Sequence, residues 1–176
     1  SVQLRVLDEA GAPVAPGEVG EIVASGPNIA LGYWRDPEAG AATFRDGALH
    51  TGDLASIDGE GFITIVDRAK DILKCGGNRV SCREVEETIH HFEGMVEAAV
   101  VGIPDDLLGE AVCLFAVHPQ GEAITAELAA YCERQLARHL VPRRTLFLKS
   151  LPKNSSGKYD KPALRRLLET REGGGQ

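Results

Sequence analysis

The first third of the chain consists of short runs in which apolar and polar residues alternate. Residues 2–8 (VQLRVLD) have the spacing of a half-buried strand, and residues 21–26 (EIVASG) return after a turn-rich connection. Similar short segments continue to residue 67, and the sequence DGEG at 58–61 is typical of a hairpin turn between two of them. The pattern predicts that residues 1–67 are all β, as part of a β-barrel or meander.

The spacing of the apolar residues changes after residue 67. Residues 71–80 (DILKCGGNRV) have the composition of a short strand interrupted by two glycines. Ser81 and Glu84 then have the spacing of a capping box, in which each side chain binds a backbone amide at the start of a helix. Three apolar residues of this helix share one face before Gly94 stops it: Val85, Ile89 and Phe92.

Strands and helices alternate in the remainder of the chain. Residues 96–103 and 111–119 read as two buried strands joined by a loop. A second helix begins at Thr125 and is expected to end at Pro142. Its apolar stripe contains Leu128, Cys132, Leu136 and Leu140.

A last strand and helix complete the predicted fold. Residues 145–151 read as a strand, and a short helix is expected from Pro162 to about Arg171. The predicted fold class is α+β: a β remnant over residues 1–67, followed by a small α+β domain over residues 68–176.

Composition and charge restrict the possible functions. The chain has 176 residues and a net charge of -7, which argues against a nucleic-acid binder that neutralises phosphates with a basic surface. No apolar run approaches a membrane span, and the N-terminal residues do not resemble a signal peptide. We therefore expect a soluble, cytoplasmic protein.

The cysteine residues give no sign of a metal site. Cys75, Cys82, Cys113 and Cys132 include no CxxC pair. Cys113 and Cys132 occupy positions where apolar residues are expected, which indicates buried thiols in a reducing compartment. We expect no zinc site.

Each polar motif has an ordinary structural explanation when it is taken alone. In HTGDL (50–54), Asp53 could cap its own backbone, and Arg68 could form a surface ion pair. The sequence GGNR at 76–79 could be a tight turn, and the polar stretch 150–161 a solvated loop.

Taken together, in this order and spacing, the motifs resemble the adenylate-forming superfamily of acyl- and aryl-CoA ligases, peptide-synthetase adenylation domains and luciferases. The matching motifs are GEIVASGPNIALGYW (20–34), HTGDL (50–54), DRAKDILKCGGNRVSCREVEE (67–87) and LPKNSSGKYDK (151–161). The resemblance implies that residues 1–67 end a large N-terminal domain in its β-barrel subdomain. Residues 68–176 would be the mobile C-terminal lid domain.

The resemblance also implies a reaction in two steps. A fatty or aryl carboxylic acid is joined to ATP, with Mg²⁺, to give acyl-AMP, and the acyl group then passes to CoA or to the pantetheine of a carrier protein. By resemblance Asp53 and Arg68 hold the ribose; a carboxylate can accept two hydrogen bonds and a guanidinium is a planar donor. Lys158 is the implied catalytic residue, because an ammonium group can stabilise the charge that develops during adenylation.

Further residues receive roles from the same resemblance. Lys70 would be the hinge about which the C-terminal domain swings. The loop from Lys74 to Arg79 would face the active site in the second step, with Lys74, Gly76 and Gly77 beside the pantetheine channel. Arg79 could bind a nucleotide phosphate or anchor the loop to the large domain.

Two parts of the superfamily's active site are absent from these residues: the pyrophosphate loop and the carboxylate pocket. The predicted activity therefore belongs to a parent enzyme that includes the remainder of the N-terminal domain, and we expect the chain alone to be inactive. The leading interpretation is the C-terminal part of an AMP-forming acyl-CoA ligase. The alternatives are an adenylation enzyme that loads a carrier protein and a non-catalytic split or docking module.

Overall fold

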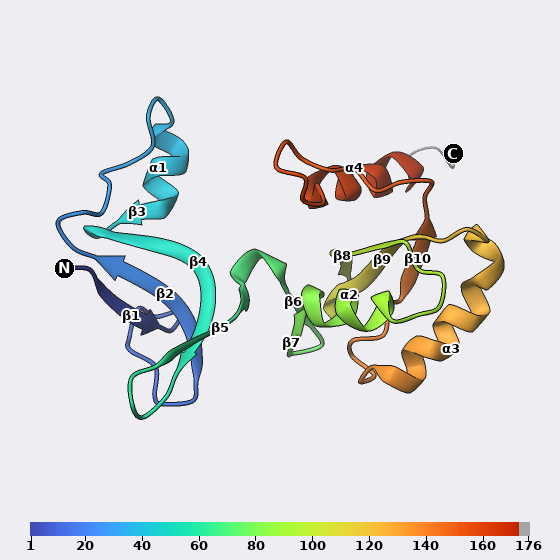
Figure 1. The fold of residues 1–176 in the computed structure, drawn as a ribbon, viewed down its shortest axis with the longest axis horizontal. Helices are drawn as coiled ribbons and strands as arrows, with labels where there is room; N and C mark the ends of the chain where they lie inside the picture. Colours follow the sequence, from blue (N-terminus) through green and yellow to red (C-terminus); the bar gives the residue numbers. More distant parts are fainter. Residues whose placement is uncertain (173–176) are drawn as a thin grey trace. The chain divides into compact units, whose positions relative to one another are not determined.

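The structure is a computed structural model that describes residues 1–172, and it consists of two compact units (Figure 1). The chain passes from the first unit to the second between Lys70 and Asp71. No helix among the residues that the structure describes is long and apolar enough to cross a membrane.

The first unit is an antiparallel sheet of five strands. These are β1 (Gln3–Leu7), β2 (Val19–Ser25), β3 (Phe44–Arg45), β4 (Ala48–Ile57) and β5 (Ile63–Arg68). The order is β1-β2-β4-β3, and β5 also pairs with β4. The predicted turn at 58–61 joins β4 to β5, where the Asp58 carboxylate accepts hydrogen bonds from the amides of Glu60 and Phe62, both at 2.9 Å. Within the described residues the sheet is open, so it is a meander and not a closed barrel.

One segment of the first unit differs from the all-β prediction. Helix α1 (Pro37–Thr43) replaces the strand expected there. Asp36 caps this helix by accepting a hydrogen bond from the Ala39 amide at 3.0 Å, and Pro37 occupies the first turn, where no amide donor is needed. The prediction was wrong because the β pattern of the neighbouring segments was extended across this helix-start signal.

The second unit contains a mixed sheet of five strands. These are β6 (Ile72–Cys75), β7 (Asn78–Ser81), β8 (Glu97–Asp105), β9 (Gly109–Val117) and β10 (Arg144–Phe147). Strand β10 runs parallel to β9, and the other pairs are antiparallel. Residues 71–80 are therefore not one interrupted strand but a hairpin. Its loop is Gly76-Gly77, whose φ angles of 57° and 79° suit a two-residue turn that favours glycine.

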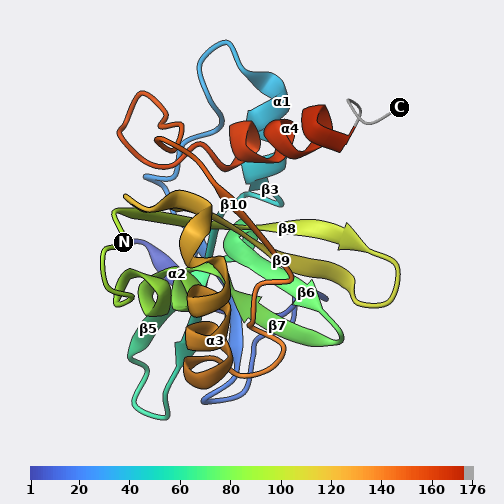
Figure 2. The ribbon, with the colours of Figure 1, turned by 90° about the vertical axis from the view of Figure 1, so that its right-hand side faces the viewer.

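Three helices cover the two faces of this sheet. They are α2 (Cys82–His90), α3 (Thr125–Gln135) and α4 (Lys161–Glu172). Alternate residues of β8 point to opposite faces, so Val100 packs with α2 and α3 while Val101 packs with α4. Figure 2 shows α4 on one side of the sheet and α2 with α3 on the other. The α+β prediction is confirmed.

The sequence predicted the start of α2 correctly but placed the end of α3 too far along the chain. The Ser81 hydroxyl accepts a hydrogen bond from the Glu84 amide at 3.1 Å, which confirms the predicted start of α2. Helix α3 ends at Gln135, well before Pro142. Leu136 and Leu140 are nevertheless buried, because the turn after the helix keeps them against the same core. All four cysteines are buried and none forms a disulfide; the burial of Cys113 and Cys132 agrees with the prediction.

Candidate functional site

Asp53 and Arg68 lie directly opposite each other on β4 and β5. Arg68 Nε donates to Asp53 Oδ1 at 2.7 Å. The Arg68 side chain is 53% exposed and the Asp53 side chain is 27% exposed. The structure thus brings together the two residues that were predicted to hold the same ribose. The ion pair uses one oxygen and one nitrogen, so Asp53 Oδ2 and the terminal nitrogens of Arg68 are the atoms that could bind two neighbouring hydroxyls.

The backbone before Asp53 forms an irregular turn within β4. Gly52 has a φ of 71°, and the register between β2 and β4 shifts at this point. The Thr51 hydroxyl donates to the Ile22 carbonyl at 2.8 Å and accepts from the Asp53 amide at 3.1 Å. Thr51, and not Asp53 itself, therefore caps this turn, which leaves the Asp53 carboxylate to Arg68.

Glu21 supports the same turn and was not identified from the sequence. Its Oε1 accepts from the Gly52 amide at 2.9 Å, and its Oε2 lies 2.9 Å from His50 Nδ1. Arg45 adds an ion pair to Glu21 at 3.7 Å. The Gly-Glu pair at the start of the first motif was the available signal, but no local pattern links residue 21 to a turn some thirty residues later.

Lys158 projects from a loop that is hydrogen-bonded to itself. The amide of Asn154 donates to the Lys158 carbonyl at 2.8 Å, and Asn154 Oδ1 accepts from the Lys158 amide at 3.0 Å. Asn154 Oδ1 also accepts from the Ser156 amide at 3.0 Å, and Gly157 completes the turn with a φ of 79°. The backbone of Lys158 is therefore fixed, while its side chain is exposed.

The beginning of this loop is attached to strand β8 through Glu97. Glu97 Oε2 accepts from the Leu151 amide at 2.9 Å, and Oε1 forms an ion pair with Lys153. The Lys153 ammonium also lies 5.6 Å from the centre of the Tyr159 ring. The hydrogen bond from Lys153, together with that from Leu151, holds the pKa of Glu97 below its usual range.

Replacing Glu97 by glutamine is expected to lower the free energy of unfolding by about 1–3 kcal/mol at neutral pH, because two hydrogen bonds lose their charged acceptor. A carboxylate with a lowered pKa stabilises the fold above its unfolded pKa, and this stabilisation is lost as the pH falls through the folded value. Urea unfolding of the 176-residue chain at pH 7 and about pH 3 measures the difference. The control is Glu93→Gln, an exposed glutamate in the preceding turn. Equal destabilisation by Glu97→Gln at both pH values would contradict the assignment.

The predicted hinge and hairpin residues lie at the start of the second unit and just before it. Lys70 is exposed in a 3-10 turn (Ala69–Asp71) at the division between the units. Lys74 and Arg79 are opposite each other on β6 and β7, and both are exposed. A Cβ on Gly77 would meet no atom within 4 Å, so the turn geometry by itself accounts for this glycine.

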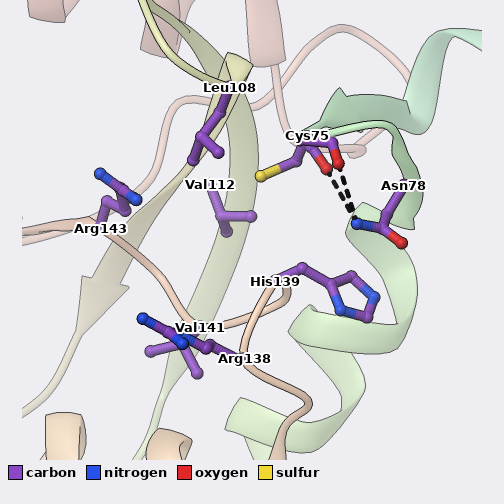
Figure 3. A pocket seen from close by; sticks show the side chains of 9 residues that line it. Cys75, Asn78, Leu108, Val112, Arg138, His139, Val141 and Arg143 are labelled. Atoms are coloured by element: carbon purple, nitrogen blue, oxygen red, sulfur yellow. Dashed lines mark hydrogen bonds between the residues drawn. The ribbon is translucent and has the colours of Figure 1, made fainter.

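A cleft of about 410 Å³ adjoins this hairpin (Figure 3). Its lining includes Cys75, Gly76 and Asn78 of the hairpin and three basic residues that follow α3, namely Arg138, His139 and Arg143. Asn78 shapes the adjacent turn by donating to the Gly76 carbonyl at 3.2 Å. Burial raises the pKa of the Cys75 thiol, which Arg143 opposes. The three basic residues were missed because more than 60 residues separate them from Gly76 in the sequence.

The Lys158 loop and the Gly76-Gly77 turn lie on opposite sides of the second unit, next to α4 and at the end of the β6–β7 hairpin respectively (Figures 1 and 2). The structure therefore does not bring all the predicted site residues together. It gives three groups: the pair Asp53–Arg68, the hairpin with Lys74 and Arg79, and the Lys158 loop.

The chain is similar to known proteins in sequence and in fold. Residues 84–158 match the family described as AMP-binding enzyme C-terminal domain. The chain is 44% identical over 171 residues to medium/long-chain-fatty-acid–CoA ligase FadD8 of Mycobacterium tuberculosis, a match that covers 93% of this chain and 30% of the ligase. It is 42% identical over 164 residues to feruloyl-CoA synthase of an Amycolatopsis species, with 93% and 33% covered.

The fold also matches solved structures. ATP-bound MatB from Rhodopseudomonas palustris aligns with a TM-score of 0.79 and 38% identity, over 94% of this chain and 34% of that one. The chain thus spans about a third of the length of the proteins that it resembles.

Proposed function

Because the chain belongs to the adenylate-forming superfamily and corresponds to its C-terminal portion, we propose that it is the C-terminal part of an AMP-forming acyl-CoA ligase. The full-length enzyme would join a carboxylate to the α-phosphate of ATP and release pyrophosphate. The CoA thiol would then displace AMP. The observation that carries this proposal is the Asp53–Arg68 pair, in which the two predicted ribose-binding residues meet at 2.7 Å.

In the first step, Asp53 would accept hydrogen bonds from the ribose hydroxyls while Arg68 holds the carboxylate in place and donates to the same sugar. The turn formed by Thr51 and Gly52, with Glu21 beneath it, supports this role because it fixes the direction in which Asp53 points. Lys158 would approach the α-phosphate and the bridging oxygen, where its positive charge stabilises the transition state more than the separated anions.

The second step would use the other side of the same unit. The placement of the Lys158 loop and the Gly76-Gly77 turn on opposite sides supports a rotation about Lys70 between the two steps, because one orientation cannot present both to a single reaction centre. Lys74, Gly76 and Gly77 would then line the path of pantetheine, and Arg79 would contact either a phosphate or the large domain.

The cleft beside this turn favours CoA as the acceptor. Arg138, His139 and Arg143 gather hydrogen-bond donors next to Gly76, and such donors suit the phosphates of CoA. Relatives with CoA-ligase activity in their names support the same choice. The alternative acceptor is the pantetheine of a carrier protein.

Mg²⁺ would accompany ATP. The residues that the structure describes contain no group of three or more His, Cys, Asp or Glu side chains that could hold a metal ion, so we assign none of them to Mg²⁺. The isolated chain would not form acyl-AMP, since the pyrophosphate loop and the acid pocket belong to the remainder of the large domain. An ATP–pyrophosphate exchange signal from residues 1–176 that Lys158→Ala abolishes would overturn this expectation.

The acceptor is tested with the full-length protein. It is incubated with ATP, Mg²⁺, a panel of fatty and aryl acids, and either CoA or a phosphopantetheine-bearing carrier protein, and the products are identified by mass spectrometry. Acyl-CoA together with AMP is the expected result and also identifies the acid. Transfer only to the carrier would move the assignment to a carrier-loading enzyme, and no AMP with any acid would favour a non-catalytic docking module.

Replacing Arg138 by alanine is expected to raise the KM for CoA about tenfold, because one hydrogen bond from a charged donor is lost. The rate of acyl-AMP formation is expected to stay unchanged. Steady-state kinetics with varied CoA measure this effect. Arg134→Ala is the matched control, because Arg134 is an exposed arginine of α3 that does not line the cleft. An unchanged KM for CoA in Arg138→Ala would remove the cleft from the CoA site.

A further inference from the structure

A cluster of three charged residues adjoins the end of the Lys158 loop; its members lie within the matched motifs, but neither the sequence analysis nor the proposed mechanism gives them a role. Lys161 Nζ lies 3.0 Å from Asp71 Oδ1 and 3.0 Å from Glu86 Oε1. The side chains are 18%, 22% and 17% exposed for Lys161, Asp71 and Glu86. Glu86 Oε1 also accepts from the Val100 amide at 2.8 Å, so the cluster is tied to the backbone of β8.

The three residues come from segments with different roles in the fold. Lys161 begins α4, three residues after Lys158, and Asp71 directly follows the proposed hinge residue Lys70. Glu86 lies in α2, which packs on the opposite face of the sheet from α4. Strand β8 pairs only with β9 among the described strands, so the cluster joins the two helix layers across the edge of the sheet.

The electrostatics favour a charged lysine at this position. Burial alone would lower the pKa of Lys161, but Glu86 and Asp71 are among the neighbours that raise it above its usual value. Loss of the ammonium group would leave two partly buried carboxylates facing each other without their shared partner. The contacts between Lys161, Asp71 and Glu86 therefore depend on the lysine.

The Lys158 loop is thus attached to the rest of the second unit at both ends. Glu97 holds its beginning through the Leu151 amide, and Lys161 holds its end. Asn154 closes the middle of the loop. Packing of α4 on the sheet through Leu164 and Leu168 also holds this end, and Lys161 adds the polar contacts that join it to Asp71 and Glu86.

We propose that Lys161 is a positioning residue for the adenylation step, which fixes the Lys158 loop to the segment that directly follows the hinge. This inference rests on the proposed function. When the domain rotates about Lys70, α4 and the Lys158 loop move with the sheet on which α4 packs, and the Asp71–Lys161 contact sets the position of the loop relative to the hinge. The ammonium group of Lys158 then arrives at a defined position, and small errors in such positions are costly in rate.

The test uses the full-length enzyme and separates the two half-reactions. ATP–pyrophosphate exchange reports adenylation, and thioester formation from added acyl-AMP reports the second step. Lys161→Met is expected to lower exchange about tenfold and thioester formation less than twofold, because Lys158 acts only in the first step. Lys161→Arg, which keeps the charge and can reach two carboxylates, is expected to restore most of the exchange.

A double-mutant cycle tests whether Lys161 affects the exchange rate through Lys158. If Lys161 acts through Lys158, Lys161→Met changes exchange little when Lys158 is already alanine. Equal loss in both half-reactions, or the same tenfold loss with and without Lys158, would overturn the positioning role. If Lys161→Met fails to fold, Asp71→Asn removes the hinge-side contact alone, and the same selective loss is expected of it.

The failure of the proposed function would look different. In that case the wild-type enzyme would show no acid-dependent exchange, which would overturn both proposals. Normal wild-type exchange with full activity in Lys161→Met would overturn only the positioning role.

Discussion

Replacing Lys158 by alanine in the full-length enzyme is expected to lower the rate of acyl-AMP formation by about 10²–10³-fold, the usual cost of removing one electrostatic stabiliser of a transition state. In the proposed mechanism the lysine matters because two anions meet in this step and negative charge accumulates around the phosphorus atom. Thioester formation from added acyl-AMP is expected to change much less, since the mechanism places Lys158 away from the reaction centre in that step. Single-turnover measurements of both half-reactions test this.

Lys149→Ala provides the control for this prediction. Lys149 is an exposed lysine just before the Lys158 loop. Its replacement removes one positive charge but leaves Lys158 and its hydrogen bond to Asn154 unchanged. We expect its half-reactions to match the wild type. Wild-type acyl-AMP formation by Lys158→Ala would remove Lys158 from the mechanism, and an equal loss in both steps would indicate a structural defect.

Replacing Asp53 by alanine is expected to lower kcat/KM for ATP by about 10²-fold. The carboxylate would accept two hydrogen bonds from the ribose, and each hydrogen bond to a charged group contributes roughly 1.5–3 kcal/mol, about tenfold or more. Arg68 would also lose the partner that orients it at 2.7 Å. The effect should therefore be seen with ATP as the varied substrate.

Two further variants separate nucleotide binding from stability. Asp53→Asn keeps one acceptor oxygen and should fall between the wild type and alanine. Glu60→Ala removes an exposed carboxylate at the tip of the β4–β5 hairpin and should leave kcat/KM for ATP unchanged. If Asp53→Ala binds ATP normally, or if Glu60→Ala lowers kcat/KM equally, the assignment of Asp53 to the ribose is wrong.

Local sequence patterns were sufficient for the elements that depend on local chemistry. The capping position of Ser81, the turn at 58–61 and the buried face of α2 all follow from residues within a few positions of one another. Helix α1 was missed although Asp36 and Pro37 mark its start, because the β pattern of the neighbouring segments was extended across it. The end of α3 at Gln135 has no local signal.

The candidate site was predictable where a motif names its residues, and not where distant segments meet. The resemblance to the superfamily identified Asp53 and Arg68. They lie opposite each other because of the bulged register between β4 and β5, which the sequence does not reveal. Glu21 and Lys161 could not be identified in this way. Their partners lie between 24 and 90 residues away in the chain, so only the folded structure brings them together.

The nucleotide products formed by the full-length protein are the sharpest test of the proposed adenylation reaction. Phosphorus NMR of reactions with ATP, Mg²⁺ and a carboxylic acid distinguishes AMP plus pyrophosphate from ADP plus phosphate. The proposed reaction predicts acid-dependent AMP and pyrophosphate, largely lost in Lys158→Ala. Formation of ADP, or AMP release that neither the acid nor Lys158 affects, would contradict it.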